Sequence, residues 1–156
     1  MIVKQRLTTA ILLLPALFAQ DKPPVAVVEK TMSQETNDPR LHLTLKNESN
    51  KRIEAIVIRM DFLSAPGAQT DSPARRAFTA IYGLRPDSPV ISPSTQWKLD
   101  IGKFPKTVSG EALPLKSFTI DYVRLAGGDY WGPDTMRQAE RIAGVFDGFR
   151  MAQPKQ

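Results

Sequence analysis

The sequence predicts an all-β domain, a sandwich of about seven short strands followed by one C-terminal helix. Apolar and polar residues alternate in several segments, which is the pattern of strands with one buried face. Prolines and glycines separate these segments at intervals of roughly ten residues, as turns do in a sandwich. Beyond residue 134 the apolar residues recur with a helical period instead.

The first half of this domain contains three predicted strands. Segment 25–32 begins with alternating valines and predicts the first strand, and alternating leucines mark the second over 41–46. Segment 53–63 is apolar on both parities and rich in β-branched residues, which favour strands. It therefore predicts a central strand with both faces covered, and a long connection over 64–76 follows it.

The second half contains further short strands. Segments 78–82 and 97–101 are separated by a proline-rich connection, and the next strand covers 118–125. The apolar parity of that strand changes after Tyr122. We therefore predict a β-bulge near Asp121, because one extra residue reverses the faces of a strand.

The chain then makes a turn and changes to a helix. Ala126–Asp129 predicts a tight hairpin turn with glycines at positive φ, and Tyr130–Trp131 forms the last strand. Thr135 and Gln138 have the spacing of a capping box at the start of a helix. The helix has two weakening glycines and needs a surface to dock on, either its own sandwich or a partner. Its predicted apolar arc consists of Met136, Ala139, Ile142, Ala143, Phe146 and Phe149.

The N-terminal segment predicts export. Lys4 and Arg6 precede an uncharged run that ends at Ala19, and this layout is that of a secretory signal peptide. The run is shorter than the roughly 20 residues that a membrane span requires. We therefore expect a signal peptide over 1–19, a sandwich domain over 20–132, and an amphipathic helix and tail over 133–156, with the mature protein periplasmic or secreted.

The charge and the cysteine content of the chain indicate whether nucleic acid or a membrane is an expected partner. Without Lys4 and Arg6, 19 of the 21 basic residues remain against 16 acidic residues, a mild excess of +3 without a basic cluster. Nucleic-acid binding needs clustered basic side chains, so we expect no nucleic-acid partner. The chain has no cysteine, which excludes disulfides and a lipid-modified cysteine. We expect no stable membrane insertion once the leader is removed.

Two stretches resemble known families. The hairpin sequence Leu43–Phe62 resembles the B–C hairpin of bacterial immunoglobulin-like modules and is similar to the extracytoplasmic modules called FxLyD. The stretch Ile120–Asp134 is similar to the ending of certain uncharacterised secreted bacterial proteins. The resemblance implies an immunoglobulin-like sandwich in an exported setting, and it carries no catalytic residue to this chain.

Residues that could perform catalysis or bind a metal are few. The single histidine, His42, lies on the polar parity of a predicted strand, where a solvent-facing position is expected. One histidine without cysteine is too little for a zinc site or a convincing catalytic triad. Asp121, Asp129 and Asp134 could offer oxygen ligands to calcium, but turn and helix-start positions give two of them structural roles. We predict no catalytic residue, no metal site and no cofactor.

Aromatic residues are the candidates for binding. Tyr130 and Trp131 lie among glycines, where an exposed ring could contact a partner. The alternative is that Trp131 packs under the C-terminal helix, and this is the arrangement that we expect. Trp97 alternates with apolar residues and is expected in the core.

These observations together predict a non-enzymatic binding or structural module that interacts with an unidentified protein. Its working surface is expected in the loops at one end, including 64–76, or at the Tyr130–Trp131 corner. The alternative is a small extracytoplasmic hydrolase or carbohydrate-active protein with its site in the same loops. Acidic side chains that converge in a concave pocket would favour the alternative.

Overall fold

A computed structural model describes residues 22–33, 38–65, 67 and 74–152 of the chain. The predicted leader over 1–19 and most of the predicted connection over 64–76 lie outside the described residues. The described part contains seven strands and one α-helix: β1 (Val25–Met32), β2 (Leu41–Asn47), β3 (Ile53–Phe62), β4 (Ala74–Ile81), β5 (Gln96–Ile101), β6 (Leu115–Leu125), β7 (Tyr130–Trp131) and α1 (Ala139–Ala152).

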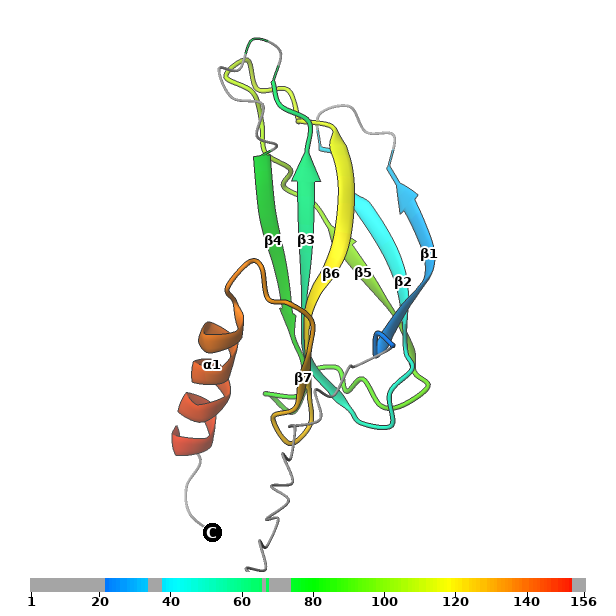
Figure 1. Cartoon of the computed structure of the whole chain (residues 1–156), viewed down its shortest axis with the longest axis vertical. Coiled ribbons are helices and arrows are strands. Elements are labelled where there is room, and N and C mark those ends of the chain that lie inside the picture. The colour runs from blue at the N-terminus through cyan, green and yellow to red at the C-terminus, as the bar shows by residue number, and fades with distance from the viewer. Residues whose placement is uncertain (1–21, 34–37, 66, 68–73, 153–156) are drawn as a thin grey trace, which may run out of the picture.

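The strands form two antiparallel sheets, so the prediction of an all-β fold is confirmed (Figure 1). One sheet has the order β1-β2-β5 and the other the order β4-β3-β6-β7. Two strands start earlier than the sequence indicated, β4 at Ala74 and β6 at Leu115, because polar residues on their exposed faces mask the alternation.

The main core lies between the two sheets. It combines Leu41, Leu43 and Leu45 of β2 with Ile56, Ile58, Met60 and Phe62 of β3, all at most 4% exposed. Strand β3 pairs with β4 on one side and with β6 on the other, as expected for a central strand. The two faces of β3 pack into different hydrophobic clusters. Residues such as Ile56 and Ile58 belong to the main core, and the alternate residues Ala55 and Val57 belong to a second core.

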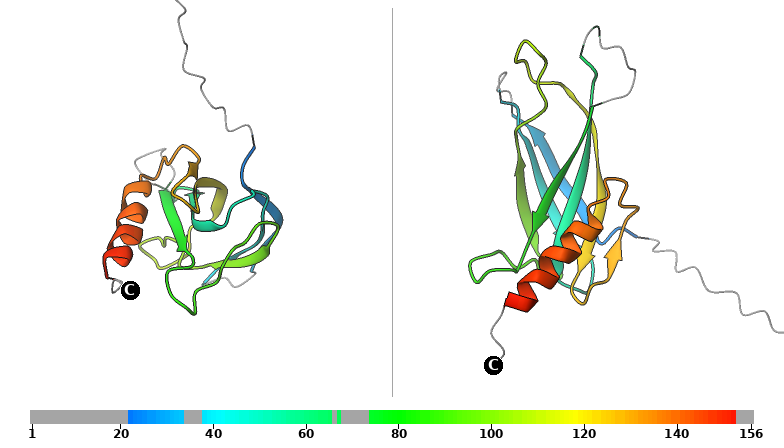
Figure 2. Two further views of the ribbon diagram at one scale, coloured as in Figure 1. Left: turned by 90° about the horizontal axis from the view of Figure 1, so that it is seen from below. Right: turned by 90° about the vertical axis from the view of Figure 1, so that its left-hand side faces the viewer.

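That second core is built with α1. The helix lies along the outer side of the four-stranded sheet, opposite to β1-β2-β5 (Figure 2). Ile142 and Phe146 are buried there against Ala55, Val57 and Tyr122. Of the two predicted docking modes, the structure shows the helix seated on its own domain.

The predicted capping box at Thr135 and Gln138 is wrong. The helix begins at Ala139, and Arg137 has a φ of 52°, which interrupts any helix that would start at Thr135. The Asp134 carboxylate accepts hydrogen bonds from the backbone N–H groups of Gln138 and Ala139, at 2.7 and 3.1 Å. Thr135 points elsewhere, because its hydroxyl bonds to Asp121.

The bulge and the hairpin turn occur where the sequence predicts them. Val57 pairs with Tyr122 while its neighbour Ile58 pairs with Ile120, so Asp121 is the extra residue of β6. Tyr122 therefore faces the helix side, and Ile120 faces the main core. In the turn that follows, Gly127 and Gly128 both have a φ of 90°, which side chains with a Cβ rarely adopt.

Candidate functional site

The last strand is too short to cover the edge of β6. Strand β7 pairs only with Val123 and Arg124, and Figure 1 shows it beside the lower end of β6 alone. Over Leu115–Ile120, no strand in the described part of the chain pairs with the side of β6 that faces away from β3. From Ser117 to Ile120 alternate backbone N–H and C=O groups point to that side, and a register shift leaves Lys116 as an extra residue before them. The segment is therefore an unpaired sheet edge.

Asp121 explains why β7 stops. Its buried carboxylate accepts hydrogen bonds from the backbone N–H groups of Thr135 and Met136, at 3.1 and 2.9 Å, and from the Thr135 hydroxyl at 2.5 Å. Its carbonyl accepts a further bond from the Asp134 N–H at 3.1 Å. At Gly132, with a φ of 105°, a Cβ would overlap that same carbonyl oxygen. These contacts direct the chain away from the β6 edge and toward α1.

Strand β1 forms the corresponding edge of the other sheet. It pairs with β2 alone, and a bulge between Val27 and Glu29 shifts its register. Beyond Val25, which is only 3% exposed, β1 leaves apolar side chains accessible: Val27 is 40% exposed and Met32 is 41% exposed. The core is therefore open along this edge.

Lys30 occupies an unusual position on β1. It pairs with the buried Leu43, and directly opposed residues share a face of the sheet, so Lys30 stands on the core side. Its ammonium nitrogen lies 5.9 Å from the centre of the Phe118 ring on β6. A cation over an aromatic face at this distance is a favourable contact.

Two hollows run along the opening between β1 and β6. The upper hollow has a volume of about 610 Å³ and is lined by residues that include Lys30, Met32, Leu115 and Phe118. The lower hollow has a volume of about 400 Å³ and is lined by Pro23, Val25, Val27, Phe118, Thr119, Ile120 and Trp131. Phe118 lines both hollows, so together they form one continuous surface, termed here the β1–β6 seam.

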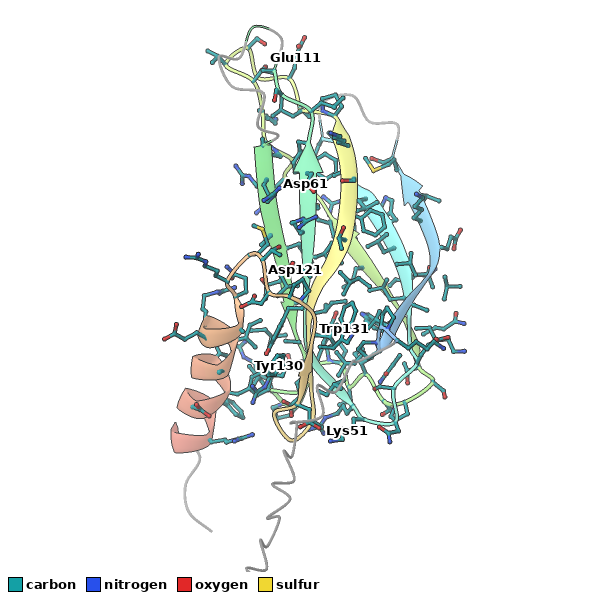
Figure 3. All side chains as sticks on the ribbon, in the orientation of Figure 1. Lys51, Asp61, Glu111, Asp121, Tyr130 and Trp131 are labelled. Carbon is teal, nitrogen blue, oxygen red and sulfur yellow. The ribbon has the colours of Figure 1, made fainter. Side chains whose placement is uncertain are left out.

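The two predicted binding residues lie on opposite sides of β7 (Figure 3). Trp131 pairs with Val123, faces the main core and lines the lower part of the seam. The expectation that Trp131 packs under the helix is therefore wrong, because strand alternation places it on the core side. Tyr122 takes the position under the helix instead.

Tyr130 faces the opposite way and belongs to a different surface. It is 60% exposed, and its ring stacks on Tyr122 with a centroid distance of 6.0 Å and an interplanar angle of 22°. Burial raises the pKa of Tyr122 above its ordinary value, in spite of the nearby Arg124. Lys51 and Asp129 form an ion pair, and both residues line the same surface hollow as Tyr130.

The opposite side of the sandwich is closed. Trp97 of β5 donates its indole N–H to the Tyr82 hydroxyl at 2.9 Å, and the two rings meet edge to face at 83°. This contact joins the two sheets. Trp97 is partly buried and packs against the main core. Burial raises the pKa of Tyr82 to about 12.

A polar hollow of about 360 Å³ lies on the outer face of the three-stranded sheet. His42 is partly exposed there, with its Nδ1 3.5 Å from Asp100 Oδ1. The Arg40 guanidinium bonds to Asp100 and lowers the pKa of that carboxyl. Glu29, which also lines the hollow, accepts a hydrogen bond from Thr44, its direct cross-strand partner on β2. The two acids therefore already have polar partners on different rungs of the sheet.

The three aspartates considered for calcium do not gather at one point. Asp121 holds Thr135 and Met136, Asp129 pairs with Lys51, and Asp134 caps α1. Within the described residues, no group of three histidine, aspartate or glutamate side chains could hold a metal ion.

Comparison of the chain with protein-family models, with curated proteins and with solved structures gives no match. In the described part of the chain, no helix has both the length and the apolar character needed to cross a membrane. The candidate site is therefore defined by its geometry, and that geometry distinguishes the β1–β6 seam from the remaining surface.

Proposed function

We propose that this protein is an exported, non-enzymatic binding module with an immunoglobulin-like sandwich, and that it binds another protein through the β1–β6 seam. The sheet orders support the immunoglobulin-like assignment. If the strands are named in chain order A, B, C, C′, E, F and G, the two sheets become A-B-E and C′-C-F-G. Variable-type immunoglobulin sandwiches have the same strands C′, C, F and G in one sheet.

The observation that carries the proposal is the open seam. Proteins normally cover or charge the edges of their sheets, because unpaired edges associate with other chains. Here two edges, β1 and the upper part of β6, lie opposite each other with apolar side chains exposed between them. Apolar surface in a concave, strand-bordered opening is typical of an interaction site.

The polar hollow at His42 gives less support to a hydrolase. A catalytic pair of acids needs one group that holds a proton and one that acts as a base, in reach of the same substrate atom. Asp100 is held by Arg40, which favours its charged form, and Glu29 bonds to its direct cross-strand partner Thr44. We therefore favour binding over catalysis.

The binding proposal is tested by capture from the native extracytoplasmic fraction with residues 20–156 as bait. Two seam variants, Val27→Glu and Met32→Glu, place a carboxylate on the exposed apolar edge. Val90→Glu is the matched control, because Val90 is 53% exposed and lines neither seam hollow. We expect a protein that is retained by the parent and by Val90→Glu and lost from both seam variants. Equal retention by all four baits would place the binding surface elsewhere.

Export is tested separately, on the protein from its native cell. We expect an N-terminus near Gln20 and recovery in the extracytoplasmic fraction, because the leader pattern ends at Ala19. A chain that keeps Met1 and stays inside the cell would contradict export.

A further inference from the structure

Resting on the proposed function of the seam, we infer that its ligand is an extended peptide segment of another protein, added as a new strand to β6 over Leu115–Ile120. The segment carries apolar side chains at alternate positions and an acidic side chain beside Lys30.

The unpaired edge of β6 selects an extended backbone. From Ser117 to Ile120, where β6 pairs with β3 in unbroken register, the outward N–H and C=O groups repeat at every second residue, and only a strand presents matching groups with the same repeat. A helix satisfies its backbone groups internally, so it would leave the β6 edge without partners. Peptide recognition by strand addition takes its affinity from such main-chain hydrogen bonds.

The inner side chains of β6 explain the need for alternate apolar residues. Leu115, Phe118 and Ile120 pack against the main core but stay partly exposed, whereas Ile58 and Phe62 on the neighbouring β3 are fully buried. A strand next to β6 would point every second side chain into the two hollows. Those side chains would complete the core where β7 does not reach.

Charge defines one end of the ligand. Lys30 and Lys116 both line the upper hollow, and among the described residues that line either hollow there is no acid. In the unbound protein, a lysine on the inner face of an edge strand opposes indiscriminate edge pairing. An acidic side chain on the incoming strand would pair with Lys30. The same lysine charge would then favour acidic peptides over neutral or basic ones.

The same charge argues against a second copy of this chain as the occupant. A symmetric contact brings the same surface of each copy together. Such a contact at the seam would set Lys30 and Lys116 against their own counterparts, and like charges in one interface are unfavourable. A different, acidic partner avoids this repulsion.

The probe for the test is a library of random peptides long enough to span Leu115–Ile120, selected on residues 20–156. We expect enriched peptides to alternate apolar residues, to lack proline in the paired stretch and to carry Asp or Glu near one end. Lys30→Glu should weaken binding of an enriched acidic peptide by about tenfold or more. Lys98→Glu is the matched control, since it makes the same charge change on exposed β5, outside the seam, and should leave binding unchanged.

Amide hydrogen exchange with an enriched peptide distinguishes this inference from the proposed function. Strand addition requires slower exchange at the amides within Leu115–Ile120 that point away from β3, which alternate from Ser117 to Ile120. If the peptide perturbs seam side chains and leaves these amides unprotected, strand addition is overturned while binding at the seam stands. If no peptide is enriched, or if the enriched peptides bind Met32→Glu equally well, the inference fails even where the capture experiment has confirmed a protein partner at the seam.

Discussion

Asp121 is the residue that most affects the form of this molecule. It is 1% exposed, and it is both the bulge residue of β6 and the acceptor for the backbone of residues 134–136. A buried carboxylate is stable only when its oxygens accept hydrogen bonds. The β6 bulge that carries Asp121 and the turn at residues 134–136 therefore stabilise each other. Through it, the chain leaves the sheet after two residues of β7.

Asp121→Asn should therefore destabilise the protein strongly. Oδ1 accepts from the Thr135 N–H and hydroxyl, and Oδ2 accepts from the Met136 N–H. An amide NH₂ in place of either oxygen cannot accept, so one backbone N–H loses its partner. We expect a loss of roughly 2–4 kcal/mol in the free energy of unfolding, measured by urea denaturation.

Asp129→Asn is the control for that variant. Its carboxylate pairs with Lys51 at an exposed position, and exposed ion pairs contribute about 1 kcal/mol or less. If the Asp121 variant were no less stable than the Asp129 variant, the carboxylate would not hold the turn into α1.

Tyr82 makes a prediction about alkaline pH. Its pKa is about 12 in the folded protein against an ordinary value of 10, so the unfolded chain loses this proton first as the pH rises. Stability from Tyr82 is complete below pH 10 and is lost as the pH rises toward 12, by on the order of 2 kcal/mol.

The measurement is the free energy of unfolding across the alkaline range, for the parent and for Tyr82→Phe. The variant lacks the titrating hydroxyl, so its stability should fall less steeply with pH, although it loses the bond from Trp97. Equal slopes for the two proteins would contradict a raised pKa at Tyr82.

At the scale of elements, α1 depends on the sheet under it. Gly144 and Gly148 each cost about 1 kcal/mol relative to alanine, so a helix of this length would be weak alone. The buried Ile142 and Phe146 supply the docking surface. Arg124 supports it, because its guanidinium lies 4.9 Å from the Phe146 ring centre and bonds to the buried Glu54 at 3.1 Å.

Ile142→Ala should show how much this docking contributes. The side chain is fully buried, and we expect a loss of about 2–4 kcal/mol in the free energy of unfolding. Val145→Ala, on the more exposed face, should change it by about 0.5 kcal/mol or less. Equal effects of the two variants would mean that the helix does not rest on the sheet in solution.

Truncation after Gly132 extends this test to the whole element. It removes the cover from Ala55, Val57 and Tyr122, so we expect a clearly lower melting temperature. An unchanged melting temperature would show that the sandwich is stable without α1, and would favour a partner as the binding site of the helix.

At the scale of the whole molecule, the sandwich has one closed side and one open side. Trp97 and Tyr82 join the sheets on the closed side. On the open side, the short β7 and the singly paired β1 leave the seam. The asymmetry follows from the route of the chain, since residues that could have extended β7 form the connection to α1.

The strands could be predicted because their signals are local. Alternating leucines in β2 and the double-sided apolar pattern of β3 indicate their pairing roles directly, and the parity change after Tyr122 indicates the bulge at Asp121. The glycines of the hairpin turn, which have positive φ, likewise allow the turn to be predicted from the sequence.

The candidate site could not be predicted, because it depends on contacts between distant segments. At the bulge after Val27, the next residue Val28 is also apolar, so the sequence does not show which parity faces the core. The inward position of Lys30 therefore stays hidden in the sequence. The sequence favours Trp131 under the helix, but the face of this residue follows from its pairing with Val123. That β7 is too short to cover β6 can be seen only in the structure, where β7 pairs with Val123 and Arg124 alone.

Binding at the β1–β6 seam is tested most directly by a nuclear magnetic resonance map of the binding surface, recorded on isotope-labelled residues 20–156 with the captured partner. We expect the shift changes to concentrate on β1 and on Leu115–Ile120 of β6. Changes centred on Tyr130 and Lys51, or on His42 and Asp100, with β1 and β6 unaffected, would contradict binding at the seam.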